Sequence, residues 1–389
     1  MEDQSFYTLT VHADEDKKAH FGAVSVPIYA SSIFAFSDVD EGIQIHNHEK
    51  PGYYYGRLGN PTTEALERAA AKLEAAESAA AFASGMAAIS GTITALVEKG
   101  EQIVAPKSMY STTTNLLKFL SDRFAIQTVF ADATDTGAFM AAISDKTKLV
   151  WLESPSNPLL EISDIRAIAS AAHRVGACVV IDNTFATPFN QRPLELGADA
   201  VIHSATKYLG GHSDLTAGIL AGPADLVARV RETTFRYFGG NIAPQVAWLV
   251  LRGIKTLALR MERHNANAYA LAKTLLTHPK VKAVFYPGLE THKNHEIARS
   301  QMSGFGGMLS FDLGSAVAAK KFIGRVKLCT YATSLGGVES IVQPVALMTH
   351  ATLSASERAA SGISEGLIRM SVGVEDFEDI HKDVSDALC

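Results

Sequence analysis

Cysteine is scarce in this chain, and its placement argues against two kinds of stabilising site. Only Cys178, Cys329 and Cys389 occur, an odd number without the close spacing that structural zinc sites use. A disulfide framework is therefore not expected, and a reducing cytoplasm is predicted. His46 and His48 lie in a polar turn with no second cluster, so we interpret them as surface histidines and predict no metal site.

Long runs of one residue type are also missing. There is no extended basic run, and no apolar run is long enough to span a bilayer. Residues 1–4 lack the basic and then apolar pattern of a signal peptide. With a formal net charge of −6, the composition predicts neither nucleic acid nor membrane as a partner and favours a small-molecule substrate.

What the chain does have is length and apolar content. Its 389 residues are 47% hydrophobic, which is enough to bury a large core and predicts two domains. Residues 1–60 show little periodicity, so we expect an N-terminal arm without a core of its own that lies on something else, either another part of the chain or a second subunit.

Strand-like and helix-like segments alternate after this arm. A capped amphipathic helix is predicted from Thr62-Thr63 onward. Short apolar runs separated by helical sequence follow at 79–83, 102–105, 126–130, 149–152, 178–181 and 198–203. This alternation predicts an α/β fold with a mainly parallel sheet covered on both faces and a ligand at the carboxyl ends of its strands.

A glycine-containing break at 238–244 ends this region. It predicts a large domain over 61–243 and a smaller C-terminal α+β domain over 244–389. In the smaller domain, a helical pattern over 245–277 is interrupted at Gly253, and strands are expected at 308–311 and 368–372.

The stretch 204–214 carries the strongest chemical signal. Lys207 follows a buried run and is flanked by Ser204 and Thr206, with a glycine pair shortly after. Hydroxyl groups beside a lysine suit a phosphate, and such a lysine can form an imine with a carbonyl, as in the tethering of pyridoxal 5′-phosphate (PLP). On residue types alone, a solvated loop lysine remains an alternative.

Three further features at predicted strand ends fit the same ligand. Ser84-Gly85-Met86 opens a helix where backbone N–H groups can bind an anion, or it forms a plain tight turn. Asp182 is a carboxylate that could pair with a protonated pyridine nitrogen, or cap a strand end. Tyr110 could stack on a flat ring or pass a proton, or be a core tyrosine.

The motifs together resemble one family along nearly the whole chain, the Cys/Met-metabolism PLP-dependent enzymes, which include γ-lyases and γ-synthases. The resemblance rests on YGRLGNPT (55–62), SGMAA (84–88), ESPSNP (153–158), DNT (182–184), SATKY (204–208), SLGGVES (334–340) and GLIRMSVG (366–373). It implies fold type I of PLP-dependent transferases, the aspartate-aminotransferase-like fold.

The resemblance also implies roles around the cofactor. Lys207 matches the lysine that holds PLP, Asp182 the partner of its pyridine nitrogen, and Tyr110 the tyrosine stacked on its ring. The phosphate group would be held within the subunit by Gly85, Met86, Ser204 and Thr206. Tyr55 and Arg57 would reach that phosphate from the neighbouring subunit, in a homotetramer built from two dimers.

Substrate contacts follow from the same resemblance. Arg369 matches the arginine that grips the substrate α-carboxylate, helped by Asn157 and Ser334. Glu339 matches a glutamate that meets a distal cationic group in cystathionine-type γ-enzymes, although a solvated loop acid is the alternative. Thr112 stands where methionine γ-lyases typically carry a cysteine, which departs from that branch.

The activity expected from the resemblance is γ-elimination from an amino acid of the homoserine or homocysteine type, such as cystathionine, a methionine-like substrate or canavanine. The alternative is γ-replacement on O-acetyl- or O-succinylhomoserine by a thiol or another nucleophile. Aminotransfer and a non-catalytic scaffold are two further hypotheses. A nicotinamide-dinucleotide site is not predicted, because no Gly-x-Gly-x-x-Gly follows the first strand.

Overall fold

A seven-stranded sheet forms the larger half of the computed structural model, which describes residues 4–14, 18, 20–348, 354, 356, 358 and 362–389. The strands follow the order β1 (Ser78–Phe82), β7 (Gly218–Gly222), β6 (Ala200–His203), β5 (Cys178–Asp182), β4 (Thr147–Glu153), β2 (Gln102–Pro106) and β3 (Gln127–Ala131). Only the pairings of β7 with β1 and β6 are antiparallel. The predicted mainly parallel sheet is thus confirmed, whereas β7, a short apolar run between two glycines, was not predicted.

Helices bury both faces of this sheet because alternate strand residues point to opposite sides. One face, with Phe82 and Trp151, packs against α4 (Gly85–Leu96), α5 (Ser111–Phe124) and α9 (Ala224–Thr233). The other face, with Ala81 and Leu152, packs against α3 (Pro61–Glu74), α6 (Thr136–Ala141), α7 (Ile165–His173) and α10 (Pro244–Ile254). Functional groups are therefore left to the strand ends.

Helix α3 begins earlier than predicted, so its expected cap at Thr62-Thr63 is wrong. Asn60 is the N-cap, and its side-chain oxygen accepts a hydrogen bond from the Thr62 backbone N–H at 2.9 Å. Pro61 occupies the first helical position, where its lack of an N–H costs nothing. The Thr62 hydroxyl instead donates to the carbonyl of Pro27.

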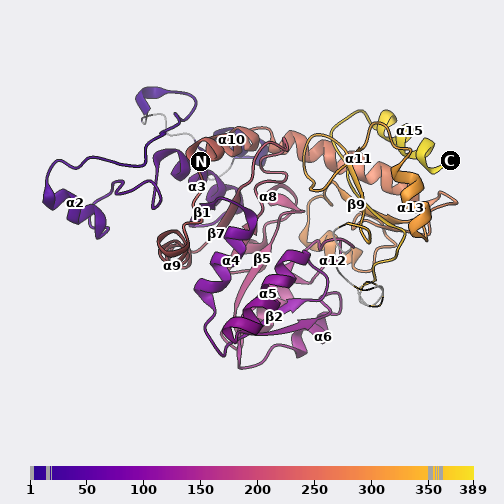
Figure 1. Ribbon diagram of the computed structural model, residues 1–389, viewed down its shortest axis with the longest axis horizontal. Coiled ribbons are helices and arrows are strands. Elements are labelled where there is room, and N and C mark those ends of the chain that lie inside the picture. Colours follow the sequence, from indigo (N-terminus) through magenta and orange to yellow (C-terminus); the bar gives the residue numbers. More distant parts are fainter. Residues whose placement is uncertain are drawn as a thin grey trace.

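A second sheet lies toward the C-terminus, where the orange and yellow segments gather in Figure 1. Its strand order is β10 (Thr330–Tyr331), β11 (Ile341–Pro344), β12 (Leu367–Ser371), β9 (Met308–Asp312) and β8 (Ala283–Phe285). One face packs against α11 (Leu257–Leu276), α13 (Ala316–Ile323) and α15 (Phe377–Leu388). The helical pattern over 245–277 is interrupted as predicted, because α10 ends at Ile254 and α11 begins at Leu257.

The alternation along β12 decides which side chains leave the second core. Ile368 and Met370 point into it, so Arg369 lies on the opposite face. Ser310, its neighbour on β9, shares that face and donates a hydrogen bond to the Pro158 carbonyl at 2.7 Å. Since Pro158 belongs to the loop after β4, this face of the second sheet meets the strand ends of the first.

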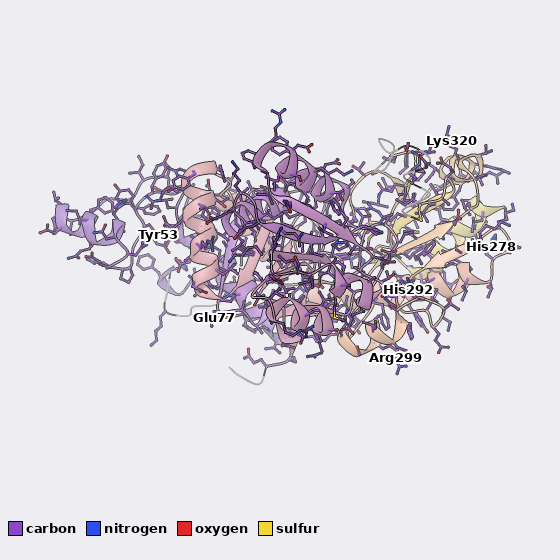
Figure 2. All side chains as sticks on the ribbon, turned by 90° about the horizontal axis from the view of Figure 1, so that it is seen from below. Tyr53, Glu77, His278, His292, Arg299 and Lys320 are labelled. Atoms are coloured by element: carbon purple, nitrogen blue, oxygen red, sulfur yellow. The ribbon has the colours of Figure 1, made fainter. Side chains whose placement is uncertain are left out.

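The N-terminal segment extends away from both sheets. Helix α1 (Phe6–His12) contacts α3 and α11, whereas α2 (Val39–His46) projects into solvent, as Figure 1 shows. Figure 2, turned by 90°, shows the segment around Tyr53 outside the body again. Ile33 and Val39 are 74% and 78% exposed there. The remaining short helical segments are η1 (His20–Gly22), α8 (Thr187–Asn190), η2 (Pro193–Leu196), η3 (Thr234–Phe238) and α12 (His295–Gln301).

In the part of the chain that the structure describes, none of the helices combines the length and apolar character needed to cross a bilayer.

Candidate active site

A cavity of about 530 Å³ opens where β4, β5 and β6 end and the second sheet approaches. It gathers most of the site residues predicted from sequence: Gly85, Met86, Tyr110, Asn157, Asp182, Ser204, Thr206, Lys207, Ser334 and Arg369. They come from both halves of the chain. The carboxyl ends of parallel strands are where an α/β sheet is expected to bind a ligand.

Lys207 stands on a tight turn just after β6. Its backbone N–H donates to the carbonyl of Ser204 at 3.1 Å, and its side-chain Nζ donates to the hydroxyl of Ser334 at 2.5 Å. Burial and the nearby positive charge of Arg369 lower the pKa of the Lys207 amine to about 8, against the opposing pull of Asp182. A substantial fraction of this amine is therefore neutral near physiological pH.

Asp182 is the last residue of β5 and is 7% exposed. One carboxylate oxygen accepts hydrogen bonds from the backbone N–H of Thr184 at 3.0 Å and from its hydroxyl at 2.5 Å. Burial raises the pKa of Asp182, while those bonds lower it. The positive charges of His203 and Lys207 also favour the ionised form of Asp182, which lines the cavity.

The opposite end of the cavity is built from the start of α4. Ser84 is the N-cap, and its hydroxyl accepts from the Ala87 N–H at 3.1 Å. A Cβ on Gly85 would lie 2.8 Å from the Ser204 hydroxyl oxygen, so only glycine lets the helix start approach that loop. Backbone N–H groups and hydroxyls at a helix N-terminus are suited to a phosphate.

Arg369 is held at the third side of the cavity and is only 4% exposed. Its Nη1 donates to the side-chain oxygen of Asn157 at 2.7 Å, and its Nη2 donates to the Ser334 carbonyl at 3.1 Å. With its side-chain amide turned so that the oxygen faces the guanidinium, Gln343, opposite it on β11, accepts from its Nε at 2.9 Å. A guanidinium fixed in one plane can bind a carboxylate with two parallel hydrogen bonds.

Three of the predicted residues do not line this cavity. Arg57 donates to the backbone carbonyls of Phe235 and Arg236 at 2.9 Å each, and its guanidinium lies 5.5 Å from the ring centre of Tyr55. Glu339 is half-buried and accepts a hydrogen bond from the hydroxyl of Ser213. Their predicted roles therefore stay predictions.

Sequence reasoning assigned no role to Glu153, Gln343 or Thr184, although each touches a site residue. Glu153 ends β4 and lines the cavity. The signal for Glu153 was present, because it follows a buried apolar run just as Asp182 does. No comparable signal existed for Gln343, whose place beside Arg369 depends on strand register.

Comparison with known proteins identifies the family of this chain. The family model described as Cys/Met metabolism PLP-dependent enzyme matches residues 7–389. The chain belongs to this family. The resemblance inferred from the motifs is therefore confirmed, and with it the dependence on PLP.

Relatives named as γ-lyases are similar over almost the full length of this family member. L-methionine gamma-lyase of Pseudomonas putida is 43% identical over 385 residues, covering 98% of this chain and 97% of the relative. Cystathionine gamma-lyase of Bacillus subtilis is 42% identical over 381 residues, covering 98% of each.

A solved structure of cystathionine gamma synthase from Xanthomonas oryzae is similar in fold, with a TM-score of 0.94 and 39% identity. It covers 99% of this chain and 98% of the other. The predicted fold type I is thereby confirmed.

The residues present fit the cofactor of this family. The buried acid Asp182, which lines the cavity, suits a protonated ring nitrogen, and the glycine at the start of α4 leaves room for an anion beside Ser204. Lys207, whose pKa is lowered to about 8, presents an amine that can react with an aldehyde.

Proposed function

We propose that the protein catalyses PLP-dependent γ-elimination from an amino acid of the homoserine or homocysteine type. The observation that carries this proposal is the shared cavity of Lys207, Asp182 and Arg369. It combines an amine able to move a proton, a counter-charge for a cationic ring and a clamp for an α-carboxylate. The names of the γ-lyase relatives support the same reaction.

PLP would be held by Lys207 at its aldehyde carbon, by Asp182 at its ring nitrogen, and by Gly85, Met86, Ser204 and Thr206 at its phosphate. When bound, it supplies a conjugated cationic ring that accepts the electron pair left behind when a substrate proton departs. Tyr55 and Arg57 would complete the phosphate site from a neighbouring subunit.

The protein's own groups account for binding and proton movement. Arg369, oriented by Asn157, binds the substrate α-carboxylate. Lys207 removes the Cα proton through its neutral amine, which the Ser334 hydroxyl orients at 2.5 Å. Loss of a second proton, from Cβ, supplies the electron pair that expels the Cγ substituent, and the hydroxyl of Tyr110 gives a proton to that leaving group.

The leaving group is constrained by the wall beside Tyr110. Ser111 and Thr112 follow it at the start of α5 and line the cavity. Hydroxyl groups there favour a polar distal group such as the amino-acid half of cystathionine or the guanidinooxy group of canavanine. Glu339 would meet a cationic end of such a substrate.

A second candidate is γ-replacement on O-acetyl- or O-succinylhomoserine with a thiol or another nucleophile. The solved structure named cystathionine gamma synthase favours it. Both reactions need the same groups up to the loss of the Cγ substituent, and they differ in whether a nucleophile then adds.

We infer further that the protein works as a homotetramer of two dimers in the cytoplasm. The arm over residues 1–60 exposes apolar side chains such as Ile33 and Val39, which a second copy would cover. The three cysteines are free thiols, which suits a reducing compartment. We also propose that residues 61–243 and 244–389 are two domains, each centred on one sheet, with α10 at the start of the second range packing against the first sheet.

Product identification tests the proposal. The purified protein is incubated with cystathionine, methionine, homocysteine, canavanine, and O-acetyl- and O-succinylhomoserine, each with and without a thiol. Formation of 2-oxobutanoate and ammonia is the expected result. A new thioether would establish γ-replacement, homoserine would reveal water addition at Cγ, and conversion of the cofactor to its amine form with the γ-group retained would establish aminotransfer.

A further inference from the structure

Glu153 joins two walls of the active-site cavity. It is the last residue of β4 and is 5% exposed. Its Oε2 accepts the backbone N–H of Tyr110 at 2.9 Å, and its Oε1 accepts the backbone N–H of Asn157 at 2.8 Å. Each carboxylate oxygen is therefore occupied by a backbone group from a different loop.

Each loop presents a side chain to the ligand. The loop after β2 carries Tyr110, and the loop after β4 carries Asn157, whose side-chain oxygen accepts from Arg369 at 2.7 Å. The Glu153 carboxyl group thus holds the backbone at Tyr110, where α5 begins. Through Asn157, it also helps to set the orientation of the Arg369 guanidinium.

This carboxylate is costly to bury. Burial first, and then the nearby charge of Asp182, raises the pKa of Glu153 to about 8, while the two backbone bonds lower it. An apolar side chain would avoid that cost but would leave both N–H groups without their acceptor. The presence of an acid at position 153 is therefore explained by the two backbone N–H groups that it binds.

We propose that Glu153 is a positioning residue that sets the carboxylate clamp through Asn157 and the ring-facing wall through Tyr110. The inference rests on the proposed amino-acid substrate. It assigns Glu153 a positioning role and no proton transfer.

The test is a double-mutant cycle between Glu153→Gln and Asn157→Ala, in the PLP-loaded protein. The glutamine keeps the shape but turns an amide N–H toward one of the two backbone donors. The alanine leaves its backbone N–H in place and removes the side-chain amide, whose oxygen meets Arg369. The measured quantity is the dissociation constant of the amino acid alanine, which lacks a γ-leaving group. Binding is detected by the change in cofactor absorbance.

We expect Glu153→Gln to weaken alanine binding about tenfold in the parent protein, on the scale of leaving one buried N–H donor without its acceptor. In the Asn157→Ala background the same change should weaken it less than about twofold, since the link to Arg369 is already broken. An equal loss in both backgrounds would overturn the proposal.

Asp383→Asn is the matched control. Asp383 is also a buried acid whose two oxygens accept backbone N–H groups, those of Lys327 at 2.7 Å and Cys329 at 2.9 Å, but it lies on α15, outside the cavity. The Asp383→Asn substitution should lower the thermal unfolding midpoint and leave alanine binding unchanged. Loss of alanine binding in this control would count against a specific role for Glu153.

A replacement variant and the choice of alanine as ligand keep the test of Glu153 interpretable. If Glu153→Gln does not fold, Glu153→Asp replaces it in the cycle, because the shorter acid keeps the carboxyl group but cannot reach both N–H groups. Alanine binding requires no elimination. A protein that shows the coupling but releases no γ-group would contradict the proposed function alone.

Discussion

The two sheets contribute to the cavity in different ways. The first sheet offers groups at or just beyond strand ends, namely Glu153, Asp182 and Lys207. The second offers Arg369 from the middle of β12, where Gln343 and Ser310 flank it on the neighbouring strands. Lys207 is partly accessible and has a lowered pKa, whereas Arg369 is 4% exposed and fixed by hydrogen bonds.

This difference separates reaction from recognition. A side chain that must gain and lose a proton needs freedom to move and a pKa near the working pH. A group that must bind one carboxylate in one orientation needs a rigid strand. Substitutions of Asp182 and Lys207 should therefore lower kcat, and substitutions in the second sheet should mainly raise KM. Glu153 belongs with the second group in its effect, because it acts on Arg369 through Asn157.

The largest expected effect is that of Lys207→Ala. Removing the amine takes away both the attachment of the cofactor and the base at Cα, so kcat should fall about 10⁴-fold or more. Steady-state turnover and the thermal midpoint are measured together, with Lys382→Ala, an exposed lysine on α15, as the control. Near-normal turnover by a folded Lys207→Ala protein would refute the assignment.

Asp182→Asn should come next. The amide keeps the size of the side chain and can still accept from Thr184, but it no longer balances a positive ring. We expect kcat to fall about 10²- to 10³-fold, the scale seen when one preorganised electrostatic contact is lost. Asp383→Asn serves again as the control, and an equal loss there would remove the special status of Asp182.

Arg369→Lys moves the comparison to the second sheet. A lysine keeps the charge but cannot make the paired contact or hold Asn157 and Ser334 together. KM should rise about 10- to 100-fold with a smaller change in kcat. The exposed Arg299→Lys should behave as the parent. A fall in kcat without a rise in KM would contradict the assignment of substrate binding to the second sheet.

The smallest effect is the pH dependence of Lys207 reactivity. Burial and the charge of Arg369 lower its pKa to about 8, so the neutral amine is lost as pH falls through that value. In the cofactor-free protein, labelling of Lys207 by an amine-directed reagent should rise about tenfold from pH 7 to pH 9. Mass spectrometry reads the labelled peptide, and exposed Lys382 supplies the comparison. A midpoint near 10 would contradict the lowered pKa.

Local patterns predicted part of the first sheet's contribution. The apolar run at 178–181 predicted β5, and the polar residue after it predicted Asp182 at the cavity. The same rule applied to 149–152 would have found Glu153, since β4 runs to that residue. The strand β7 was missed because a short run between glycines carries little periodic signal.

The second sheet's contribution depended on tertiary structure. A strand was predicted at 368–372 and is found as β12. The contact of Arg369 with Asn157, however, joins residues 212 positions apart and arises from the packing of one sheet on the other. Family resemblance suggested that pairing, while spacing and propensity alone contain no information about it.

The most direct test of the account is to locate the covalent attachment of the cofactor. The PLP-loaded protein is reduced with borohydride, digested and analysed by mass spectrometry. The account predicts a phosphopyridoxyl group on Lys207 and on no other lysine. Stable modification of a different lysine, with Lys207 unmodified, would contradict it.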